Sequence, residues 1–409
     1  MGVVITGMGM QTAFGTESSE VFDRLCSGEN AVTKIDGFDC SELPVQFAGE
    51  IKDFDPMPVM KNSKKVRQTA RFIQYGYVAC HKALERAGLL NFDGSKDRVG
   101  MLLGSGMGGI DVFEENVIKT MKRGPRRQSP FFIPMTITNM LPGFLAVEFG
   151  FEGPNYSIST ACATANHCLI EGAHMIDRGE ADIMIVGGSE FPVNLSGMGG
   201  FCALKALSTR EDYKTASRPW DVDRDGFVVG EGAAVLILER EAHARARGVE
   251  ILARYVSGTM GCDAHHITAP HEEGRGAAKA MERALVKSKL RPTDIDYINA
   301  HGTSTQQGDV AEIKAIRKVF GTAADDLVLN STKSMLGHGL GAAAAIEACV
   351  VIESLRQGRI HPTINIENQD PQCDLNVNPG GELKKPIQLA MSNSFGFGGH
   401  NSTVILGRY

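Results

Sequence analysis

The sequence predicts an α/β protein made of two similar halves. Strand-like runs that end at glycines alternate with helical segments along all 409 residues, and this alternation is typical of α/β folds. The order of the segments occurs twice, and a chain of this length can hold two domains or one duplicated domain. We place the halves at residues 1–248 and 249–409. We expect them to pack as one unit, because no low-complexity linker separates them.

Four pairs of strands carry the repeat. In the third pair, the strand is followed by a turn and a helix in both halves, and the helices end at Gly179 and Gly358, as expected for left-handed caps. The first half has extra residues, at about 110–150 and 190–230, which we expect to cover a site or form an interface. The strand pairs are 3–6 with 253–257, 99–103 with 296–300, the run before Cys162 with 327–331, and 182–186 with 388–392.

The composition indicates a soluble protein of a reducing compartment. The hydrophobic share is 43%, the charged share is 22% and the net charge is −6, which argues against a general affinity for nucleic acid or membrane surfaces. The nine cysteines show neither paired nor zinc-binding spacing. The chain begins without the features of a secretory or transit segment, and no apolar run reaches the length of a membrane span. We therefore expect an intracellular protein that binds neither nucleic acid nor membrane.

Cys162 is the first candidate for chemistry. It lies where a short strand-like run ends and an alanine-rich helical segment begins. The first turn of a helix has unpaired N–H groups and a partial positive charge, so we expect the thiolate to be favoured there. A buried cysteine more often acts as a small hydrophobic side chain, so this interpretation needs partner residues.

Two histidines and a lysine are the expected partners. His301 follows a strand end, where open α/β sheets bind ligands. His338 occupies the position in the second half that matches Cys162 in the first. If a pseudo-twofold axis relates the halves, Cys162 faces His338, with His301 beside them. Lys333, if it is buried near Glu347, forms an ion pair that holds the site together.

Two other motifs have weaker interpretations. The run Gly104-Ser105-Gly106-Met107-Gly108-Gly109 matches a dinucleotide-binding pattern, but basic residues stand where an acidic strand end is required. We interpret the run as close packing beside the site, with Met107 facing a substrate pocket. His265, His266 and His271 suggest zinc, but no cysteine or carboxylate cluster completes the ligand set. We predict no metal site from these residues.

The four residues Cys162, His301, Lys333 and His338, with the closing segment Asn393-Ser394-Phe395-Gly396-Phe397-Gly398-Gly399, make the chain resemble the elongating β-ketoacyl-acyl carrier protein synthases, types I and II. The resemblance covers essentially the whole chain. It includes Ser208-Thr209-Arg210, Ala216-Ser217-Arg218-Pro219-Trp220-Asp221 and Arg224-Asp225-Gly226-Phe227-Val228, and the glycine–histidine details at 337–341 and 399–401 are similar to the plant-plastid branch. It implies the thiolase fold, a duplicated five-layer α-β-α-β-α arrangement, usually in a homodimer.

The resemblance also implies a reaction. Cys162 would accept an acyl chain from a carrier protein as a thioester, with the backbone N–H groups of Cys162 and Phe397 as the oxyanion hole. His301 and His338 would donate Nε2–H to the thioester carbonyl of malonyl-carrier protein during decarboxylation. The carbanion would then attack the Cys162 thioester, a Claisen condensation that extends the chain by two carbons. The activity is that of an acyltransferase of fatty-acid biosynthesis.

Further residues match family motifs around this centre. Lys333 and Glu347 match a structural ion pair, and the same network contains Asp309 and Glu312. Thr303 and Thr305 match residues that bind the phosphopantetheine arm. The matches for the acyl pocket are Met107, Phe132, Ile133 and Phe201, with Phe397 as the gate. Some relatives hold a structural cation near the positions of Asn299, Ser392, Asn393 and Glu347.

The expected partner is an acidic acyl carrier protein, in its acyl- and malonyl-loaded forms, which brings the phosphopantetheine arm, so no separate cofactor is required. A basic patch that would meet this carrier is matched by Lys64, Arg67, Arg126, Arg127 and Lys205. The location implied is the bacterial cytoplasm or the plastid stroma. Threonine is more common in bacterial relatives at the position of His400, and tyrosine at that of His265.

Three alternatives remain open from the sequence. One is a polyketide ketosynthase of the same fold. Another is a non-catalytic chain-length partner, which would lack the nucleophile that Cys162 supplies. The third is a nicotinamide-dependent oxidoreductase built on Gly104–Gly109. The sequence leaves the preferred acyl length undetermined.

Overall fold

The strands join in a mixed sheet whose order is symmetrical about its centre. The computed structural model describes residues 2–409, and within them ten strands follow the order β10-β9-β13-β14-β8-β1-β7-β6-β4-β5. Outward from the centre, the first half contributes β1 (Val3–Gln11), β7 (Gly232–Arg240), β6 (Ile183–Glu190), β4 (Val99–Gly104) and β5 (Asn155–Tyr156). The second half contributes β8 (Ala253–Cys262), β14 (His400–Gly407), β13 (Leu389–Gly396), β9 (Tyr297–Asn299) and β10 (Val328–Asn330). The predicted repeat is confirmed, because corresponding strands occupy corresponding places.

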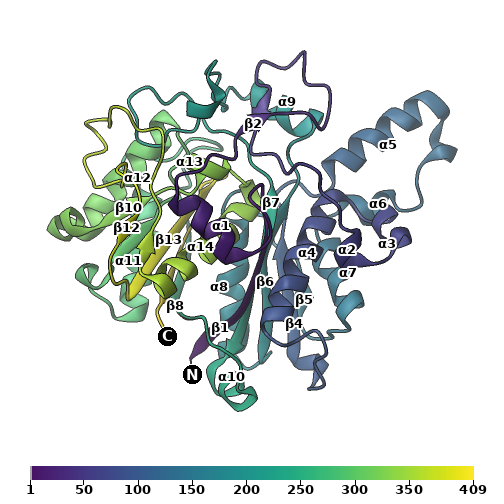
Figure 1. Cartoon of the computed structure of the whole chain (residues 1–409), viewed down its shortest axis with the longest axis horizontal. Helices are drawn as coiled ribbons and strands as arrows, with labels where there is room; N and C mark the ends of the chain where they lie inside the picture. The colour runs from purple at the N-terminus through teal and green to yellow at the C-terminus, as the bar shows by residue number, and fades with distance from the viewer. Residues whose placement is uncertain (1) are drawn as a thin grey trace.

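The two halves meet at an antiparallel pair in the middle of the sheet. Val3 of β1 lies opposite Tyr255 of β8, and Ile5 lies opposite Ala253. This pairing joins the two half-sheets into one continuous sheet. The two half-sheets are the two β layers of the predicted arrangement, with helices between them and outside them (Figure 1).

Two helices form the middle layer. α8 (Thr164–Asp177) and α14 (Ala343–Gln357) contact each other, and each contacts strands of both halves. Every residue of α14 from Ala343 to Leu355 is buried, and its three leading alanines permit close approach to the strands. Both helices are followed by a left-handed glycine, Gly179 with φ 76° and Gly358 with φ 64°, as predicted.

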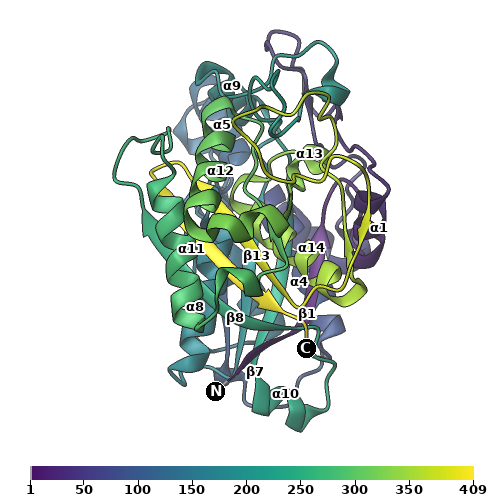
Figure 2. The same cartoon turned by 90° about the vertical axis from the view of Figure 1, so that its left-hand side faces the viewer.

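The outer layers have amphipathic helices. α4 (Arg71–Arg86) packs on β1, β7 and β6, and α11 (Arg275–Ser288) packs on β8 and β14. α12 (Gln306–Phe320) lies beside α11 over the second half (Figure 2). Each outer helix covers the apolar face of one half-sheet, so the five predicted layers are present.

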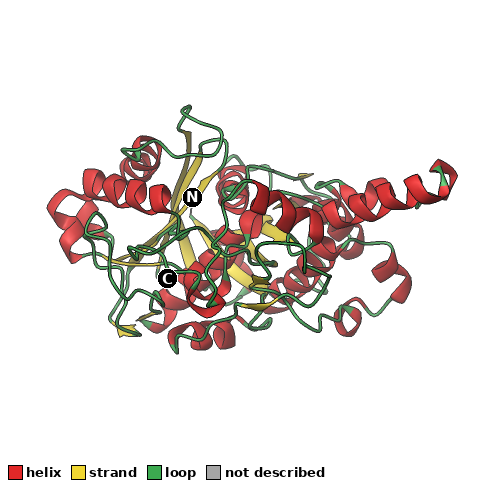
Figure 3. Ribbon diagram, turned by 90° about the horizontal axis from the view of Figure 1, so that it is seen from above, coloured by secondary structure: helices red, strands yellow, loops and turns green. Residues whose placement is uncertain are grey.

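The first insertion forms an arm that extends from the body (Figures 1 and 3). The arm is α5 (Ile110–Arg123) with the adjoining α6 (Phe132–Thr136), whereas α7 (Met140–Phe149) of the same insertion packs on α4 and β4. Large apolar side chains stay in solvent on this insertion, with Met121 83% exposed and Val147 81% exposed. Exposed apolar surface of this extent indicates an interface.

The second insertion passes over the ends of the strands. It includes α9 (Leu195–Ala203), and its later part pairs with the chain at His338, whose N–H donates to Val228 O at 2.7 Å. The remaining elements are α1 (Ser18–Cys26), β2 (Thr33–Lys34), β3 (Phe47–Ala48), α2 (Met57–Met60), α3 (Ser63–Arg67), α10 (Glu241–Arg247), α13 (Lys333–Leu336), β11 (Arg359–Ile360) and β12 (Leu383–Lys384). Within residues 2–409, none of the helices combines the length and the apolar character that crossing a bilayer requires.

The strand predicted before Cys162 is much shorter than expected. β5 contains only Asn155 and Tyr156, which pair with Met101 and Leu102 of β4. From Ser157 onward the chain leaves the sheet edge and approaches the middle layer. The backbone therefore reaches Cys162 through a turn and not through a strand end.

Candidate active site

Cys162 lies in a tight turn at the N-terminal end of α8. Ala161 has a left-handed conformation with φ 50°, which is uncommon for a residue other than glycine. Thr164 stabilises the turn, because its Oγ1 accepts the N–H of Thr160 at 2.8 Å and donates to Ala161 O at 2.7 Å. From β13, Ser394 Oγ donates to Cys162 O at 2.7 Å. The turn therefore holds the thiol in one place at the helix start.

The prediction that the Cys162 thiolate is favoured is wrong, because the pKa of the thiol is raised and not lowered. Burial raises the pKa of the thiol to about 12. The charge of Lys333 and the backbone N–H groups of Phe397 and Cys162 lower the pKa of the thiol, but they do not offset the loss of hydration. The two N–H groups predicted for the oxyanion hole thus both lie near the sulfur.

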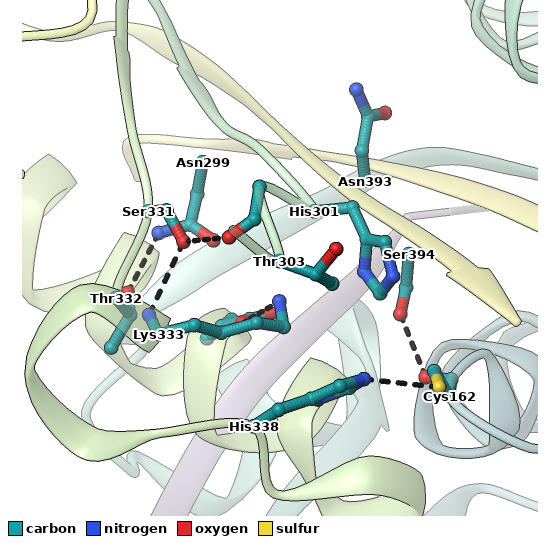
Figure 4. A network of polar contacts seen from close by, with 12 residues as sticks. Cys162, Asn299, His301, Thr303, Ser331, Thr332, Lys333, His338, Asn393 and Ser394 are labelled. Atoms are coloured by element: carbon teal, nitrogen blue, oxygen red, sulfur yellow. Dashed lines mark hydrogen bonds and ion pairs between the residues drawn. The ribbon is translucent and has the colours of Figure 1, made fainter. Parts of the chain in front are cut away.

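His338 faces the thiol as a hydrogen-bond donor. Its Nδ1 accepts the backbone N–H of Leu340 at 3.2 Å, so in the neutral ring the proton is on Nε2. Nε2 lies 3.0 Å from Cys162 Sγ (Figure 4). The preceding Gly337 has φ 73°, and a Cβ there would lie 2.9 Å from Val229 O, so the turn requires glycine.

His301 lies beside His338, as predicted. The two rings have centroids 5.4 Å apart at an angle of 82°. The backbone N–H groups of His301 and Gly302 each donate to a carboxylate oxygen of Glu312 at 2.9 Å. Burial and the charge of Lys333 hold the pKa of both imidazoles well below the ordinary value, so both rings are neutral.

The thiol and the two imidazoles converge closely. The ligand atoms of Cys162, His301 and His338 all lie within 4.8 Å of one another. This is the one group of three His, Cys, Asp or Glu residues in the described chain with metal-binding proximity. A metal would need the lone pair of His338 Nε2, but the Leu340 N–H favours the tautomer with a proton there. The arrangement therefore suits hydrogen bonding to a substrate oxygen better than metal binding.

A buried charge network lies behind the two imidazoles. Lys333 is 2% exposed and forms an ion pair with Glu347. Asp309 accepts the N–H of Thr303 at 3.1 Å and the N–H of Trp220 at 2.9 Å. These bonds link α12 and α14 to the site, and all four residues predicted for the network belong to this region.

Sequence reasoning did not assign roles to three residues of this network. Arg224 approaches Asp309 at 3.5 Å, Trp220 donates its backbone N–H to Asp309, and Ser217 Oγ donates to Lys333 O at 2.7 Å. All three lie in the motifs at 216–221 and 224–228 that carried the family resemblance. The many charged and aromatic residues in these motifs could have indicated that they belong to the site. Only the fold shows what each of their side chains contacts.

A cavity of about 570 Å³ opens onto the thiol and both imidazoles. Its walls include the predicted substrate-binding residues Met107, Phe201, Thr303, Thr305 and Phe397. The hydroxyls of Thr303 and Thr305 lie 3.0 Å apart. A cavity of this size, largely apolar with a few convergent polar groups, is typical of a substrate site.

Phe132 and Ile133 do not border this cavity, and their assignment to the acyl pocket stays a prediction. They lie on α6, where Phe132 packs against Phe113 of α5 with ring centroids 5.8 Å apart. Ile133 is 58% exposed. The last residue of α6, Thr136, accepts the N–H of Gly109 at 3.0 Å, so α6 lies beside the glycine run without contributing Phe132 or Ile133 to the cavity wall.

The predicted basic residues lie on three separate segments. Lys64 and Arg67 are exposed on α3, and Arg126 and Arg127 are exposed at residues 125–127 beyond the end of α5. Of the five, Lys205 borders the cavity. Within one chain the other four therefore lie on segments that do not line the cavity.

The glycine run 104–109 binds an internal carboxylate. Ser105 Oγ donates to Glu190 Oε1 at 2.5 Å, Met107 N–H donates to the same oxygen at 3.2 Å, and Gly106 N–H also donates to it. Glu190 thus occupies the place that a dinucleotide phosphate would need. This contact disfavours the oxidoreductase alternative.

The histidines at 265, 266 and 271 lie on a loop near the cavity. The rings of His265 and His271 have centroids 5.0 Å apart. His266 Nδ1 instead accepts the backbone N–H groups of Thr268 at 3.2 Å and Ala269 at 3.1 Å. These contacts shape the loop.

Comparisons with known proteins agree with this geometry. The Beta-ketoacyl synthase N-terminal domain matches residues 1–244, and the C-terminal domain matches residues 252–367. The chloroplastic 3-oxoacyl-[acyl-carrier-protein] synthase I of Arabidopsis thaliana is 47% identical over 98% of this chain and 85% of its own. The 3-oxoacyl-[acyl-carrier-protein] synthase 2 of Coxiella burnetii is 44% identical over 99% of this chain and 98% of its own.

A solved structure gives the same result for the fold. A ketosynthase of a type II PKS, in complex with its acyl-carrier protein, aligns with a TM-score of 0.92 and 31% identity over 100% of this chain and 99% of that chain. The duplicated fold and the cysteine with two histidines define a condensing enzyme. The chain belongs to the beta-ketoacyl synthase family, as the resemblance predicted.

Proposed function

We propose that this protein is a 3-oxoacyl-[acyl-carrier-protein] synthase, which condenses malonyl-carrier protein with an acyl chain bound to Cys162. The observation that carries the proposal is the convergence of the Cys162 thiol with two neutral imidazoles at the helix start, inside a 570 Å³ cavity. The two relatives named above support it, because both carry this enzyme name and both align with nearly the whole chain.

In the first half-reaction, the acyl chain moves to Cys162. The sulfur attacks the thioester carbonyl, the new C–S bond forms, and the carrier thiol leaves with the proton that Cys162 gives up. The backbone N–H groups of Cys162 and Phe397 stabilise the oxyanion. Because the free thiol is protonated at neutral pH, its proton leaves as the new C–S bond forms and passes to the departing carrier thiolate.

In the second half-reaction, the imidazoles act on the malonyl thioester. Nε2–H of His338, and His301 beside it, donate to the carbonyl oxygen while CO₂ leaves and an enolate forms. The nucleophilic carbon attacks the Cys162 thioester, a C–C bond forms and the C–S bond breaks, so Cys162 is regenerated. Neutral rings with fixed donors stabilise the enolate without first losing a proton.

The substrate arm and the acyl chain occupy different walls of the cavity. We assign Thr303 and Thr305 to the phosphopantetheine arm, which arrives on the carrier protein, so no free cofactor is needed. Met107, Phe201 and Phe397 are assigned to the acyl chain. The ketosynthase neighbour solved with an acyl-carrier protein supports a carrier protein as the partner. We assign the five basic residues to its docking, with Lys205 at the cavity itself.

We also propose a homodimer that buries the arm. The exposed apolar side chains of α5 and α7, together with Ile133 on α6, supply the interface. In such a dimer Phe132 and Ile133 are free to contribute to the acyl pocket of the partner chain. The boundary between the two halves remains at residue 248 in this proposal, where α10 ends.

A structural cation fits two of the four predicted side chains well. Asn299 Oδ1 and Ser392 Oγ are buried without a hydrogen-bond partner in the described chain, and their residues are paired across β9 and β13. Asn393 fits less well, because its amide bonds Thr403 Oγ1 and Glu312. We propose that Asn299 and Ser392 would hold a cation with oxygen ligands, with the carboxylate of Glu347 as a nearby charge.

The cellular location follows only from relatives. One is a chloroplastic plant enzyme and another is bacterial. We therefore propose the plastid stroma or the bacterial cytoplasm.

The test is a condensation assay with purified protein. Malonyl-carrier protein is incubated with acyl-carrier proteins of different lengths, and the 3-oxoacyl product is followed by mass spectrometry. We expect a product two carbons longer than the acyl donor. Absence of condensation with every acyl length would refute the proposal. Products extended by several unreduced units would indicate a polyketide ketosynthase instead.

A further inference from the structure

A second, small cavity lies next to the ion pair of Lys333 and Glu347. Its volume is about 10 Å³, which is close to what one water molecule requires. The polar residues in its lining are all at most 4% exposed. They are Thr12, Glu231, Thr332, Lys333 and Glu347.

Two carboxyl groups of this lining each have one oxygen without a hydrogen-bond partner in the described chain. Glu231 Oε1 accepts Ile51 N–H at 2.8 Å and Tyr75 OH at 3.0 Å, whereas its Oε2 is buried without a partner among residues 2–409. Glu347 uses Oε1 for Lys333, and its Oε2 is likewise buried and unpartnered in the described chain. A buried carboxyl oxygen left without a hydrogen bond is costly. One water in the cavity would satisfy both.

We propose that Glu231 is a positioning residue of the condensing site, which donates a hydrogen bond through one buried water to Glu347 and so keeps Glu347 ionised opposite Lys333. This inference rests on the function proposed above. Burial raises the pKa of Glu231 to about 8, which is consistent with a protonated carboxyl that can donate at neutral pH. The water passes this donation to Glu347, and a carboxylate that accepts a hydrogen bond stays ionised more readily.

The position of Glu231 connects it to both imidazoles. Glu231 comes directly after Gly230, and the N–H of Gly230 donates to His338 O at 2.9 Å. Through Glu347 it acts on Lys333, whose charge adds to the effect of burial in lowering the pKa of His301 and His338. The other ionisable groups that act on Glu347 are Lys333 and Glu312, and those that act on Glu231 are Tyr75, Glu50 and Arg71.

The direct test is a high-resolution crystal structure of the unmodified protein. We expect one water within hydrogen-bond distance of Glu231 and Glu347. An empty cavity, or a cation in it, would overturn the proposal. This result does not depend on activity, so it stays informative even if the protein proves to act on another substrate.

The functional test compares Glu231→Gln with Glu231→Leu. The measurement is the pH dependence of malonyl-carrier protein decarboxylation. Glutamine keeps an acceptor for Ile51 and a donor toward the water, so we expect an unchanged profile. Leucine removes the donor and raises the pKa of Glu347. As the pH falls, the activity that needs ionised Glu347 is then lost at a higher pH than in the unmodified protein. The acidic limb of the profile therefore moves up by about one pH unit.

Tyr75→Phe is the matched control, because it removes a partner of Glu231 on the side of Oε1 and leaves the cavity intact. We expect its acidic limb to match that of the unmodified protein. A shift in Glu231→Gln equal to that in Glu231→Leu, or a folded Glu231→Leu protein without a shift, would contradict the proposal. If the leucine variant does not fold, the glutamine profile and the crystal structure still decide. Loss of decarboxylation in the unmodified protein would instead refute the proposed function.

Discussion

The turn at Cys162 and the turn at His338 occupy equivalent places in the two halves of the fold. Each lies between the edge strand of its half, β5 or β10, and a helix of the middle layer, α8 or α14. In each turn the residue just before the functional side chain has a positive φ, 50° for Ala161 and 73° for Gly337, and Gly337 combines it with an extended ψ of −179°. A residue of positive φ therefore comes just before the nucleophile in one half and just before the hydrogen-bond donor in the other.

The two turns differ in the residues that come after the bend. α8 begins at Thr164, so the sulfur lies beside the unpaired N–H groups of the helix start. After His338 a short 3-10 turn, Leu340–Ala342, comes before α14, and the Leu340 N–H bonds the ring. A helix start stabilises negative charge, whereas a capped imidazole keeps its proton on Nε2. The two halves of the fold thus place different functional groups at equivalent positions, and each group serves a different step of the reaction.

Cys162→Gln should give the largest effect and should separate the functions of the two turns. We expect condensation to fall to the background rate, because no thioester can form, while malonyl decarboxylation persists through the two histidines. Both are measured by product analysis and CO₂ release. Cys40→Ser, on a loop outside the site, is the control. Loss of both activities in the glutamine variant would show that the roles are not divided as proposed.

His338→Ala should have the converse effect. We expect decarboxylation to slow about 10²- to 10³-fold, the typical cost of losing one donor to a developing oxyanion. Transfer of the acyl chain to Cys162, followed as the acyl-enzyme by mass spectrometry, should be affected much less. His174→Ala, at the far end of α8, controls for loss of any imidazole. An equal loss in both half-reactions would make His338 a structural residue only.

The pH dependence of stability should report the two buried imidazoles. Their pKa values in the folded state lie well below the ordinary value of about 6.5, so the unfolded chain binds more protons below that pH. Each ring should then cost about 1.4 kcal/mol of unfolding free energy per pH unit as the pH falls below 6.5. Chemical denaturation of the protein and of His338→Asn at several pH values measures this. Equal slopes in both proteins would contradict the expectation.

The bends themselves should give the smallest effects. Gly337→Ala adds a Cβ 2.9 Å from Val229 O at φ 73° and ψ −179°, a region that essentially only glycine adopts, and we expect a loss of about 1–3 kcal/mol in the free energy of unfolding. Ala161→Gly relieves a positive φ, so its effect should be less than about 1 kcal/mol. Thermal unfolding of the two variants compares them. A larger loss for Ala161→Gly than for Gly337→Ala would contradict this order.

Much of the fold and the centre of the site could be predicted. The repeat of strands and helices, the left-handed Gly179 and Gly358, and the meeting of Cys162 with the two histidines are present in the structure. These features depend on local patterns and on symmetry. The pKa of Cys162 could not be predicted, because it depends on how many atoms exclude water from the sulfur, and that number comes from the whole fold.

Other features could not be predicted for related reasons. The position of Phe132 and Ile133 relative to the cavity is one, because an insertion's direction depends on contacts that no local pattern encodes. No role was predicted for Glu190 or Glu231, because each is a single acidic residue among apolar neighbours in the sequence. Only the folded chain shows that Glu190 binds the glycine run and that Glu231 lines a cavity with Lys333.

The sequence by itself determined the order of elements, the duplication, and the family to which the cysteine, lysine and histidines point, because these are properties of spacing and residue type. The tertiary structure decided the protonation of Cys162, the tautomer of His338 and the surroundings of the buried acids. Those properties result from desolvation and from hydrogen bonds between residues far apart in the chain. Such contacts exist only after the two halves have packed around α8 and α14.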